Sequence, residues 1–207
     1  VPAKGTIKIY KLKAPEHVLR PRPWSAPDLP MLSKEEFKTL FPNDAYTNEQ
    51  SVQNWEQSDL VFSSAFNTET SKTVALKNIK KWVSGNYIIV LESEDKFKQI
   101  VKDETQINIY GNDDKTVSDQ KLFQLNTNKN SYQPNDVVVV NFGSATNLTL
   151  TVDVEKNGKI VNTYIIPLNN NKQTIAIPVQ KEDVGGFAVN YSYAAFNSFE
   201  SGSITIS

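Results

Sequence analysis

The chain has 207 residues, of which 39% are hydrophobic and 22% charged, so it holds enough apolar material for a packed core and is not disordered as a whole. Its formal charge of −1 gives no overall attraction to nucleic acid or to an anionic membrane. The lack of cysteine excludes disulfides, thiolate zinc sites, iron–sulfur clusters and a cysteine nucleophile, and a single histidine leaves little for acid–base chemistry.

Residues 1–110 contain segments rich in β-branched and aromatic residues, which favour strands. Six such segments follow one another: 6–12, 60–66, 73–79, 87–93, 97–101 and 106–110. They predict a first β-sandwich domain over residues 1–110.

An insertion at about residues 14–58 separates the first two of these strands. Five prolines between Pro15 and Pro30 keep this chain extended and out of a sheet interior. Within it, Arg20-Pro21-Arg22-Pro23-Trp24 places cations and an aromatic ring on a polyproline-prone backbone. We interpret this motif as an arginine–tryptophan clasp that holds the insertion on the sandwich, with a recognition segment as the alternative.

A short helix is predicted directly after the proline-rich segment. Ser33 and Glu36 have the spacing of a capping box, in which each side chain accepts a hydrogen bond from the other residue's backbone N–H. Leu32 and Phe37 occupy the two positions of a hydrophobic staple, and a proline ends the helix after about two turns. A second turn is expected near residues 47–55, and the aromatic face of the helix is expected to lie on the sandwich.

Composition changes near residue 111. Residues 1–110 carry 15 basic and 14 acidic side chains, whereas residues 111–207 carry 7 and 9. The polar stretch 111–119 has no buried periodicity, so it is predicted to link the first domain to a second one over residues 120–207.

The second domain shows the period-two alternation of half-buried strands, most clearly over residues 148–155. Residues 137–140 form a continuous β-branched run that suits a central strand. Asn157-Gly158 supplies the two positive-φ residues of a type I′ hairpin turn. About seven strands at this spacing predict a seven-stranded sandwich. The fold class is therefore all-β, with two fibronectin- or immunoglobulin-like antiparallel sandwich domains.

Residues that could perform catalysis are few. His17 is the single imidazole, and no G-x-S-x-G nucleophile elbow occurs. Carboxylates gather in Glu92-Ser93-Glu94-Asp95 and Asp103-Glu104, which could serve as a glycosidase pair but equally form solvated turns. We predict no catalytic, cofactor-binding or metal-binding residue, and hence a protein that is not an enzyme.

Two binding hypotheses remain open at this stage. Trp24, Trp55 and Trp82 could form a carbohydrate-stacking platform, although packing within the domain is the preferred interpretation. Asp113-Asp114 faintly suggests calcium, but the sequence around it lacks the alternating oxygen ligands of a calcium loop. A linker is the preferred interpretation there.

Several motifs resemble one protein family. In the first domain they are Gly5-Thr6-Ile7, Tyr10-Lys11-Leu12-Lys13-Ala14-Pro15, Arg20-Pro21-Arg22-Pro23-Trp24, Ser33-Lys34-Glu35-Glu36-Phe37, Phe41-Pro42-Asn43-Asp44-Ala45-Tyr46 and Trp55. This series resembles a macroglobulin domain of the large bacterial alpha-2-macroglobulin-like proteins of the Bacteroidetes type. In the second domain, residues 132–137 resemble the family's Y-x-P-G-D-x-V pattern. Asn135 replaces the glycine there, and asparagine also tolerates a left-handed conformation.

The resemblance implies two consecutive macroglobulin domains from a string of such domains, and we expect the chain to be a piece of that longer protein. Members with a Cys-Gly-x-Gln thioester capture proteases covalently, and this chain has no cysteine. The implied role is a non-catalytic scaffold within a protease-inhibiting protein of the periplasm or a lipoprotein of the cell envelope.

The partners implied by the resemblance are the neighbouring macroglobulin domains and, through the parent protein, proteases. Neither nucleic acid nor direct membrane insertion is expected. The alternative function is a carbohydrate- or protein-binding β-sandwich module of a cell-surface protein.

Overall fold

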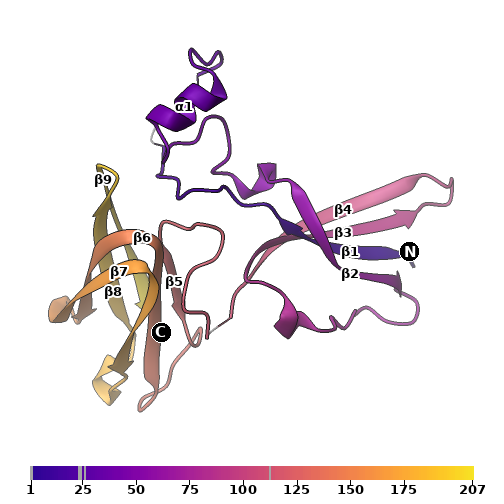
Figure 1. Cartoon of the computed structure of the whole chain (residues 1–207). Coiled ribbons are helices and arrows are strands. Elements are labelled where there is room, and N and C mark those ends of the chain that lie inside the picture. Colours follow the sequence, from indigo (N-terminus) through magenta and orange to yellow (C-terminus); the bar gives the residue numbers. More distant parts are fainter. Residues whose placement is uncertain (1, 23–24, 26, 112) are drawn as a thin grey trace. The chain divides into compact units, whose positions relative to one another are not determined.

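The structure is a computed structural model that describes all residues except 1, 23–24, 26 and 112 (Figure 1). The chain divides into two compact units. The first comprises Val1–Pro15 and Asn48–Asp113, and the second comprises Glu16–Thr47 and Asp114–Ser207. Each unit is built on one antiparallel sheet, so the all-β prediction is confirmed.

The first unit contains a four-stranded sheet with the order β2-β1-β3-β4. Its strands are Lys4–Leu12 (β1), Gln57–Asn67 (β2), Gly85–Glu94 (β3) and Ile100–Ile109 (β4). Gly5 permits the close pairing of β1 with β3, because a Cβ atom at this position would lie 1.9 Å from the carbonyl oxygen of Glu92. Two 3-10 turns, Val52–Asn54 and Ile79–Lys81, flank β2 and β3, and the first of them lies where a second turn was predicted.

Hydrophobic side chains pack on both faces of this sheet. Ile7, Ile9 and Tyr87 form a cluster on one face, and Leu12, Ile88 and Val90 form a cluster on the other. These sets alternate along the strands because successive side chains of a strand point to opposite faces.

One strand prediction in this unit is wrong, and the prediction for residues 97–101 holds only for Ile100 and Val101, which begin β4. Residues 73–79 form no strand, although Val74 and Leu76 pack on the cluster that contains Tyr87. Their alternation reflects burial of one side of an extended chain, which needs no backbone ladder. Phe97 lies in the β3–β4 turn, where the side chain of Asp95 accepts hydrogen bonds from the backbone N–H groups of Phe97 and Gln99.

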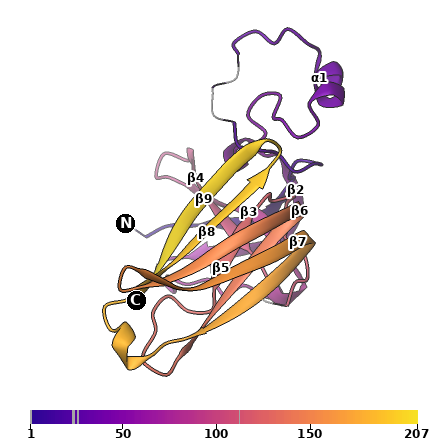
Figure 2. The same ribbon diagram turned by 90° about the vertical axis from the view of Figure 1, so that its left-hand side faces the viewer.

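The second unit contains five strands: Gln124–Thr127 (β5), Val137–Lys156 (β6), Lys159–Pro178 (β7), Phe187–Ala195 (β8) and Ser198–Ile206 (β9). The 20-residue strands β6 and β7 pair along nearly their whole length (Figure 2). The first half of β6 also pairs with β5, and its second half pairs with β8. Both halves of β6 therefore share β7 as one neighbour, but their second neighbours are different strands. A 3-10 turn, Lys181–Asp183, precedes β8.

A bulge in the middle of β6 and β7 interrupts this long pair. Residues 145 and 146 of β6 lie opposite the single residue Asn170, which has a φ of 48°. The buried Ser144 hydroxyl donates to the carbonyl of Leu122 at 2.7 Å and accepts from the N–H of Thr146 at 3.1 Å. These side-chain bonds replace ladder bonds lost at the bulge. Residues 137–140 and 148–155, predicted as separate strands, are thus two halves of one strand.

The predicted turns of the second unit are confirmed. Asn157 and Gly158 have φ values of 50° and 71° between the paired Lys156 and Lys159, as a type I′ hairpin requires. Asn135 has a φ of 77°, the left-handed conformation expected for the residue that replaces glycine.

The core of the second unit draws on both halves of β6. Its fully buried side chains from this strand are Val138, Val140, Phe142, Leu150, Val152 and Val154. Phe142 stacks on Phe123, whose ring centroid also lies 4.9 Å from that of Tyr191 and 5.0 Å from that of Tyr193. Burial, with smaller contributions from nearby Glu200 and Tyr191, raises the pKa of Tyr193 to about 12.

The insertion groups with the second unit, which differs from the expectation that residues 14–58 belong to the first domain. Glu16–Thr47 group by their contacts with Asp114–Ser207, and Val18 is buried in the second unit's core. The extended, proline-rich chain that follows Pro15 explains how this segment leaves the first sheet. Local sequence carries no information about which sheet an extended segment reaches.

Candidate functional site

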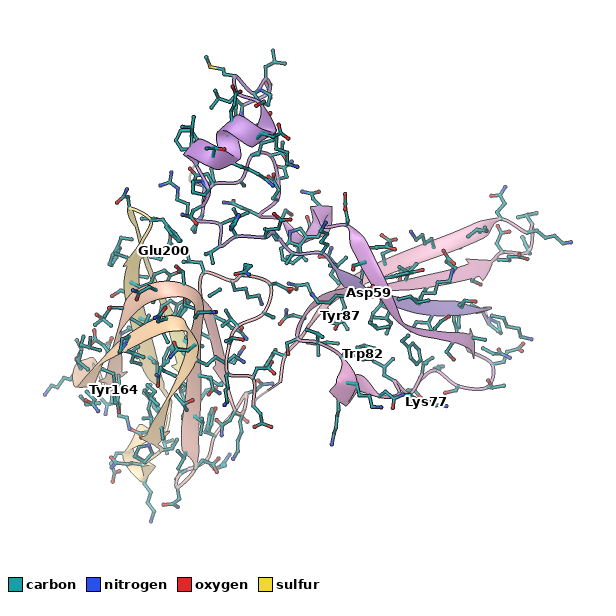
Figure 3. All side chains as sticks on the ribbon, viewed as in Figure 1. Asp59, Lys77, Trp82, Tyr87, Tyr164 and Glu200 are labelled. Carbon is teal, nitrogen blue, oxygen red and sulfur yellow. The ribbon has the colours of Figure 1, made fainter. Side chains whose placement is uncertain are left out.

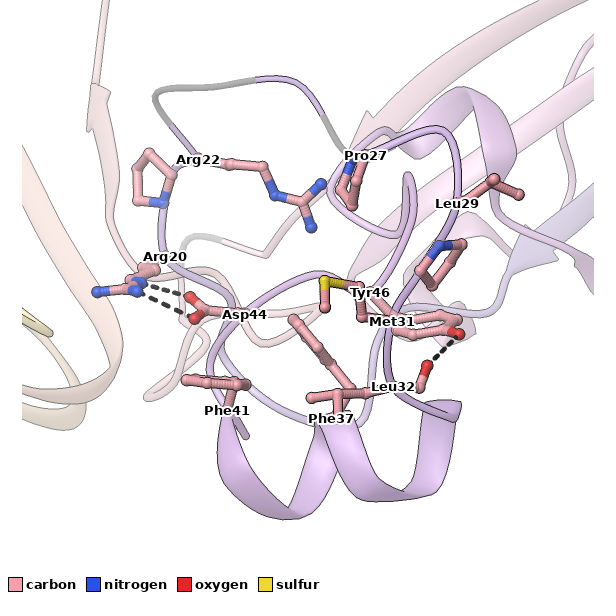
Figure 4. Close-up of a pocket in the computed structure, with 12 residues that line it drawn as sticks. Arg20, Arg22, Pro27, Leu29, Met31, Leu32, Phe37, Phe41, Asp44 and Tyr46 are labelled. Carbon is pink, nitrogen blue, oxygen red and sulfur yellow. Dashed lines mark hydrogen bonds and ion pairs between the residues drawn. The ribbon is translucent and has the colours of Figure 1, made fainter.

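The insertion encloses an apolar pocket of about 400 Å³ (Figure 4). The aromatic rings that line it are those of Phe37, Phe41 and Tyr46, and the aliphatic lining includes Leu29 and Met31. This volume falls within the range of about 300–1,000 Å³ found for ligand pockets, which are also predominantly apolar. The pocket is the candidate functional site.

A short helix, α1 (Lys34–Leu40), builds one wall of the pocket. The predicted capping box is present, because the Glu36 N–H donates to the Ser33 hydroxyl at 3.2 Å and the Ser33 N–H donates to the Glu36 carboxylate at 3.0 Å. The Ser33 hydroxyl also donates to the Glu36 carboxylate at 2.8 Å, and this bond together with the one from the Ser33 N–H lowers the pKa of Glu36. The cap starts the helix at Lys34. Phe37, in the first turn of this helix, lines the pocket.

The aromatic face of α1 packs on the insertion itself. The ring centroid of Phe37 lies 5.2 Å from that of Phe41 and 5.4 Å from that of Tyr46. The Tyr46 hydroxyl donates to the carbonyl of Leu32 at 2.9 Å, which ties the chain after the helix to the residue before its cap. This packing differs from the expectation that the aromatic face lies on a sandwich.

Arg20 lies at the start of the chain segment that lines the pocket, and it bonds to residues near the end of that segment. Its guanidinium forms a two-pronged ion pair with Asp44, in which Nη2 donates to Oδ2 at 3.0 Å and Nε donates to Oδ1. Nη1 donates to the carbonyl of Phe196 in the β8–β9 turn at 3.0 Å, and the Arg20 backbone N–H donates to the carbonyl of Asn43 at 2.8 Å. Hydrogen bonding and attraction by Asp44 raise the pKa of Arg20.

The contacts of Arg20 differ from the arginine–tryptophan clasp predicted from the sequence. Arginine pairs with aspartate, whereas the expected partner, Trp24, and Pro23 lie outside the described residues. A planar guanidinium suits this role because it bonds a carboxylate with two parallel hydrogen bonds and keeps a third donor for the Phe196 carbonyl.

Arg20→Ala is expected to loosen the insertion without unfolding the sheet of the second unit. The variant loses charge-assisted hydrogen bonds, so the amides of residues 27–47 should exchange with deuterium about tenfold faster. Hydrogen–deuterium exchange followed by mass spectrometry measures this difference. Lys34→Ala, which removes an exposed cation of the same insertion, is the control and should leave exchange unchanged. Equal protection in wild type and Arg20→Ala would contradict the role assigned to Arg20.

The carboxylate clusters are occupied in ion pairs and turns. Glu92 accepts a hydrogen bond from Lys8 at 2.8 Å, and this bond and the lysine charge lower the pKa of Glu92. Glu104 pairs with Lys102, which lies two residues earlier on the same strand, β4. A glycosidase acid needs a raised pKa, so Glu92 has the opposite property. His17, the single histidine, is exposed in the segment before the pocket.

The two described tryptophans do not form a common platform. Trp82 packs with Phe62 and Tyr87 on one face of the first unit's sheet, with ring centroids 6.5 and 5.5 Å apart (Figure 3). Trp55 packs with the cluster on the opposite face, and its indole N–H donates to the carbonyl of Glu49 at 2.8 Å. Both rings pack on the sheet, which agrees with the interpretation preferred from the sequence.

The calcium hypothesis for the linker has no support in the geometry. Asp114 lies 4.0 Å from the ammonium group of Lys172, and the residues that the structure describes contain no group of three or more histidine or acidic side chains able to hold a metal. Within the same residues, no helix has the length and apolar character needed to cross a membrane.

The pocket was not predicted from the sequence. The available signal was the apolar pair Leu29 and Met31 within a proline-rich stretch that cannot enter a sheet. Apolar side chains in such a stretch pack locally or remain exposed for a partner. When the chain was compared with family models and with curated proteins, neither comparison produced a match.

Proposed function

We propose that the chain forms non-catalytic scaffold domains of a larger alpha-2-macroglobulin-like protein of the bacterial cell envelope, and that this parent protein inhibits proteases by enclosing them. The family rests on the resemblance of the motifs in residues 5–55 and 132–137. The scaffold role rests on one observation: two pairs of motif side chains, Arg20 with Asp44 and Ser33 with Glu36, use their polar groups in contacts within the chain.

The insertion motifs illustrate this internal use. Arg20 and Asp44 pair with each other, and Ser33 and Glu36 cap a helix. The Ser33 hydroxyl lies beside the Glu36 carboxylate, but both groups are engaged at the start of the helix. The hydroxyl accepts the Glu36 N–H and donates to the carboxylate at 2.8 Å, and the carboxylate also accepts the Ser33 N–H at 3.0 Å. The contacts of these four side chains stabilise the conformation of the insertion, which supports a structural role for these residues.

The motif of the second domain is used in the same way. The Tyr132 hydroxyl donates to the side chain of Asn128 at 2.7 Å. The backbone N–H of Tyr132 donates to the carbonyl of Ser207 at 2.9 Å. The Asp136 carboxylate accepts the N–H of Gln133 at 3.0 Å. These bonds close the turn that leads into β6, which again supports a structural role.

The proposal predicts selective protection by the parent protein. After incubation with trypsin, cleavage of casein should fall at least tenfold, while cleavage of a small chromogenic peptide should persist. A small substrate diffuses into an enclosure that excludes a protein substrate. The isolated 207-residue chain is the control and should affect neither reaction. Equal loss of both activities would indicate a blocked active site, and unchanged casein cleavage would refute inhibition of this protease by enclosure.

Protein binding is the second candidate function, and the insertion pocket is the observation that favours it. The positions of Trp55 and Trp82 on opposite faces of one sheet disfavour the carbohydrate-binding form of this alternative.

A further inference from the structure

The rim of the insertion pocket exposes large apolar side chains. Met31 is 98% exposed and Leu29 is 84% exposed, and both line the pocket. Exposed apolar side chains grouped around a concave site mark interaction surfaces in soluble proteins. A small molecule within the pocket would leave this rim in water, whereas a protein segment lying across it would cover both side chains.

The polar groups inside the pocket are already bonded. The Tyr46 hydroxyl donates to Leu32, and the charges of Arg20 and Asp44 compensate each other. A polar ligand group entering here would lose water without gaining a partner, which is unfavourable. The part of a ligand that enters between the aromatic rings is therefore apolar.

Arg22 adds an uncompensated positive charge to the pocket lining. With the residues that the structure describes, Arg22 forms one hydrogen bond and no ion pair. The hydrogen bond is long, 3.4 Å from Nη1 to the carbonyl of Thr47. Figure 4 shows the Arg22 side chain extending toward Pro27 beside the pocket. A carboxylate on the ligand would complement this charge with a two-pronged pair.

We propose that the pocket binds an extended segment of a partner protein that presents a bulky apolar side chain next to a carboxylate. The apolar side chain enters between Phe37, Phe41 and Tyr46, and the carboxylate pairs with Arg22. The segment backbone covers Leu29 and Met31. This assignment is independent of protease inhibition by the parent protein.

Met31 provides a direct probe, because it is the only methionine in the chain. Protein labelled with ¹³C at the methionine methyl group, after removal of any tag, gives one methyl signal at the pocket rim. We expect acetyl-Glu-Leu-Phe-amide to shift this signal saturably. Acetyl-Gln-Leu-Phe-amide should bind at least threefold more weakly, and acetyl-Glu-Ser-Ser-amide should not shift the signal.

Matched variants separate charge from shape. In Arg22→Gln the preference for the glutamate peptide over the glutamine peptide should disappear, while Val184→Ser, which changes an exposed side chain of a different pocket, should bind as wild type does. Absence of a saturable shift with the glutamate peptide would overturn the proposal, as would equal binding of the two peptides to wild type. Saturation by n-octanol without binding of the peptide would overturn it in favour of a small apolar ligand.

Discussion

Asp183→Ala is expected to lower the free energy of unfolding of the second unit by about 3 kcal/mol. The Asp183 side chain is only 3% exposed, accepts a hydrogen bond from Lys156 at 2.6 Å and accepts the N–H of Gln180 at 2.8 Å. The variant leaves the largely buried ammonium group of Lys156 without its carboxylate, 4.6 Å from the centroid of the Phe187 ring. Urea denaturation at neutral pH measures the loss.

Lys129→Ala is the matched control for this prediction. It breaks the pair between Lys129 and Asp136, which lies 2.9 Å apart but is much more exposed than the Asp183 pair. Exposed pairs contribute less than about 1 kcal/mol because water screens them. If both variants lost the same stability, burial would not be the source of the Asp183 effect.

The Asp183 pair also makes stability depend on pH. Burial alone would raise the pKa of Asp183, but hydrogen bonds from Lys156 and Gln180 and the lysine charge outweigh burial and lower it. An aspartate in the unfolded chain has a pKa of about 3.9, so the pair contributes its full stabilisation above that pH. This stabilisation is lost as the pH falls through the lower pKa of the folded state. The stability difference between wild type and Asp183→Ala should therefore shrink on acidification from pH 7 through this range.

Phe142→Ala is expected to cost about 4 kcal/mol of the free energy of unfolding. Phe142 is fully buried and stacks on Phe123 at a centroid distance of 6.4 Å. Truncation removes the transfer free energy of the ring and leaves a cavity in the core of the second unit, which the neighbouring side chains fill only in part.

Phe199→Ala makes the same chemical change on β9, where the ring is 69% exposed, and should change stability by less than about 0.5 kcal/mol. A second readout tests the cavity itself. Water that enters beside Phe123 should reduce the burial of Tyr193 and move its pKa from about 12 back toward its ordinary value. Absorbance of tyrosinate during alkaline titration measures that shift. A fully retained stability in Phe142→Ala would contradict the packing described here.

Features that depend on neighbours in sequence were predictable. The Ser33–Glu36 capping box, the Asn157-Gly158 turn and the left-handed Asn135 each arise from residues only a few positions apart, and the structure contains all three. The alternation of side chains in β6 was equally local, because it records which side of one strand faces a core. These features were sufficient to predict an all-β protein.

The candidate site was not predictable in the same way. The motif Arg20-Pro21-Arg22-Pro23-Trp24 indicated a clasp, but its aspartate partner and the Phe196 carbonyl lie 24 and 176 residues away in the chain. No local pattern identifies partners at such separations. The pocket depends on those distant contacts, because they set the path of the insertion.

By itself, the sequence determined most of the strand-forming segments, the tight turns and the start of the short helix, since each is decided by propensity, periodicity or hydrogen bonds within a few residues. Only the tertiary structure decided that residues 137–156 form one strand with a bulge, that residues 73–79 pack without joining a sheet and that the insertion groups with the second unit. Those outcomes depend on which distant surfaces meet. An extended or alternating segment satisfies its own preferences equally well in several such arrangements, and packing between distant residues selects one of them.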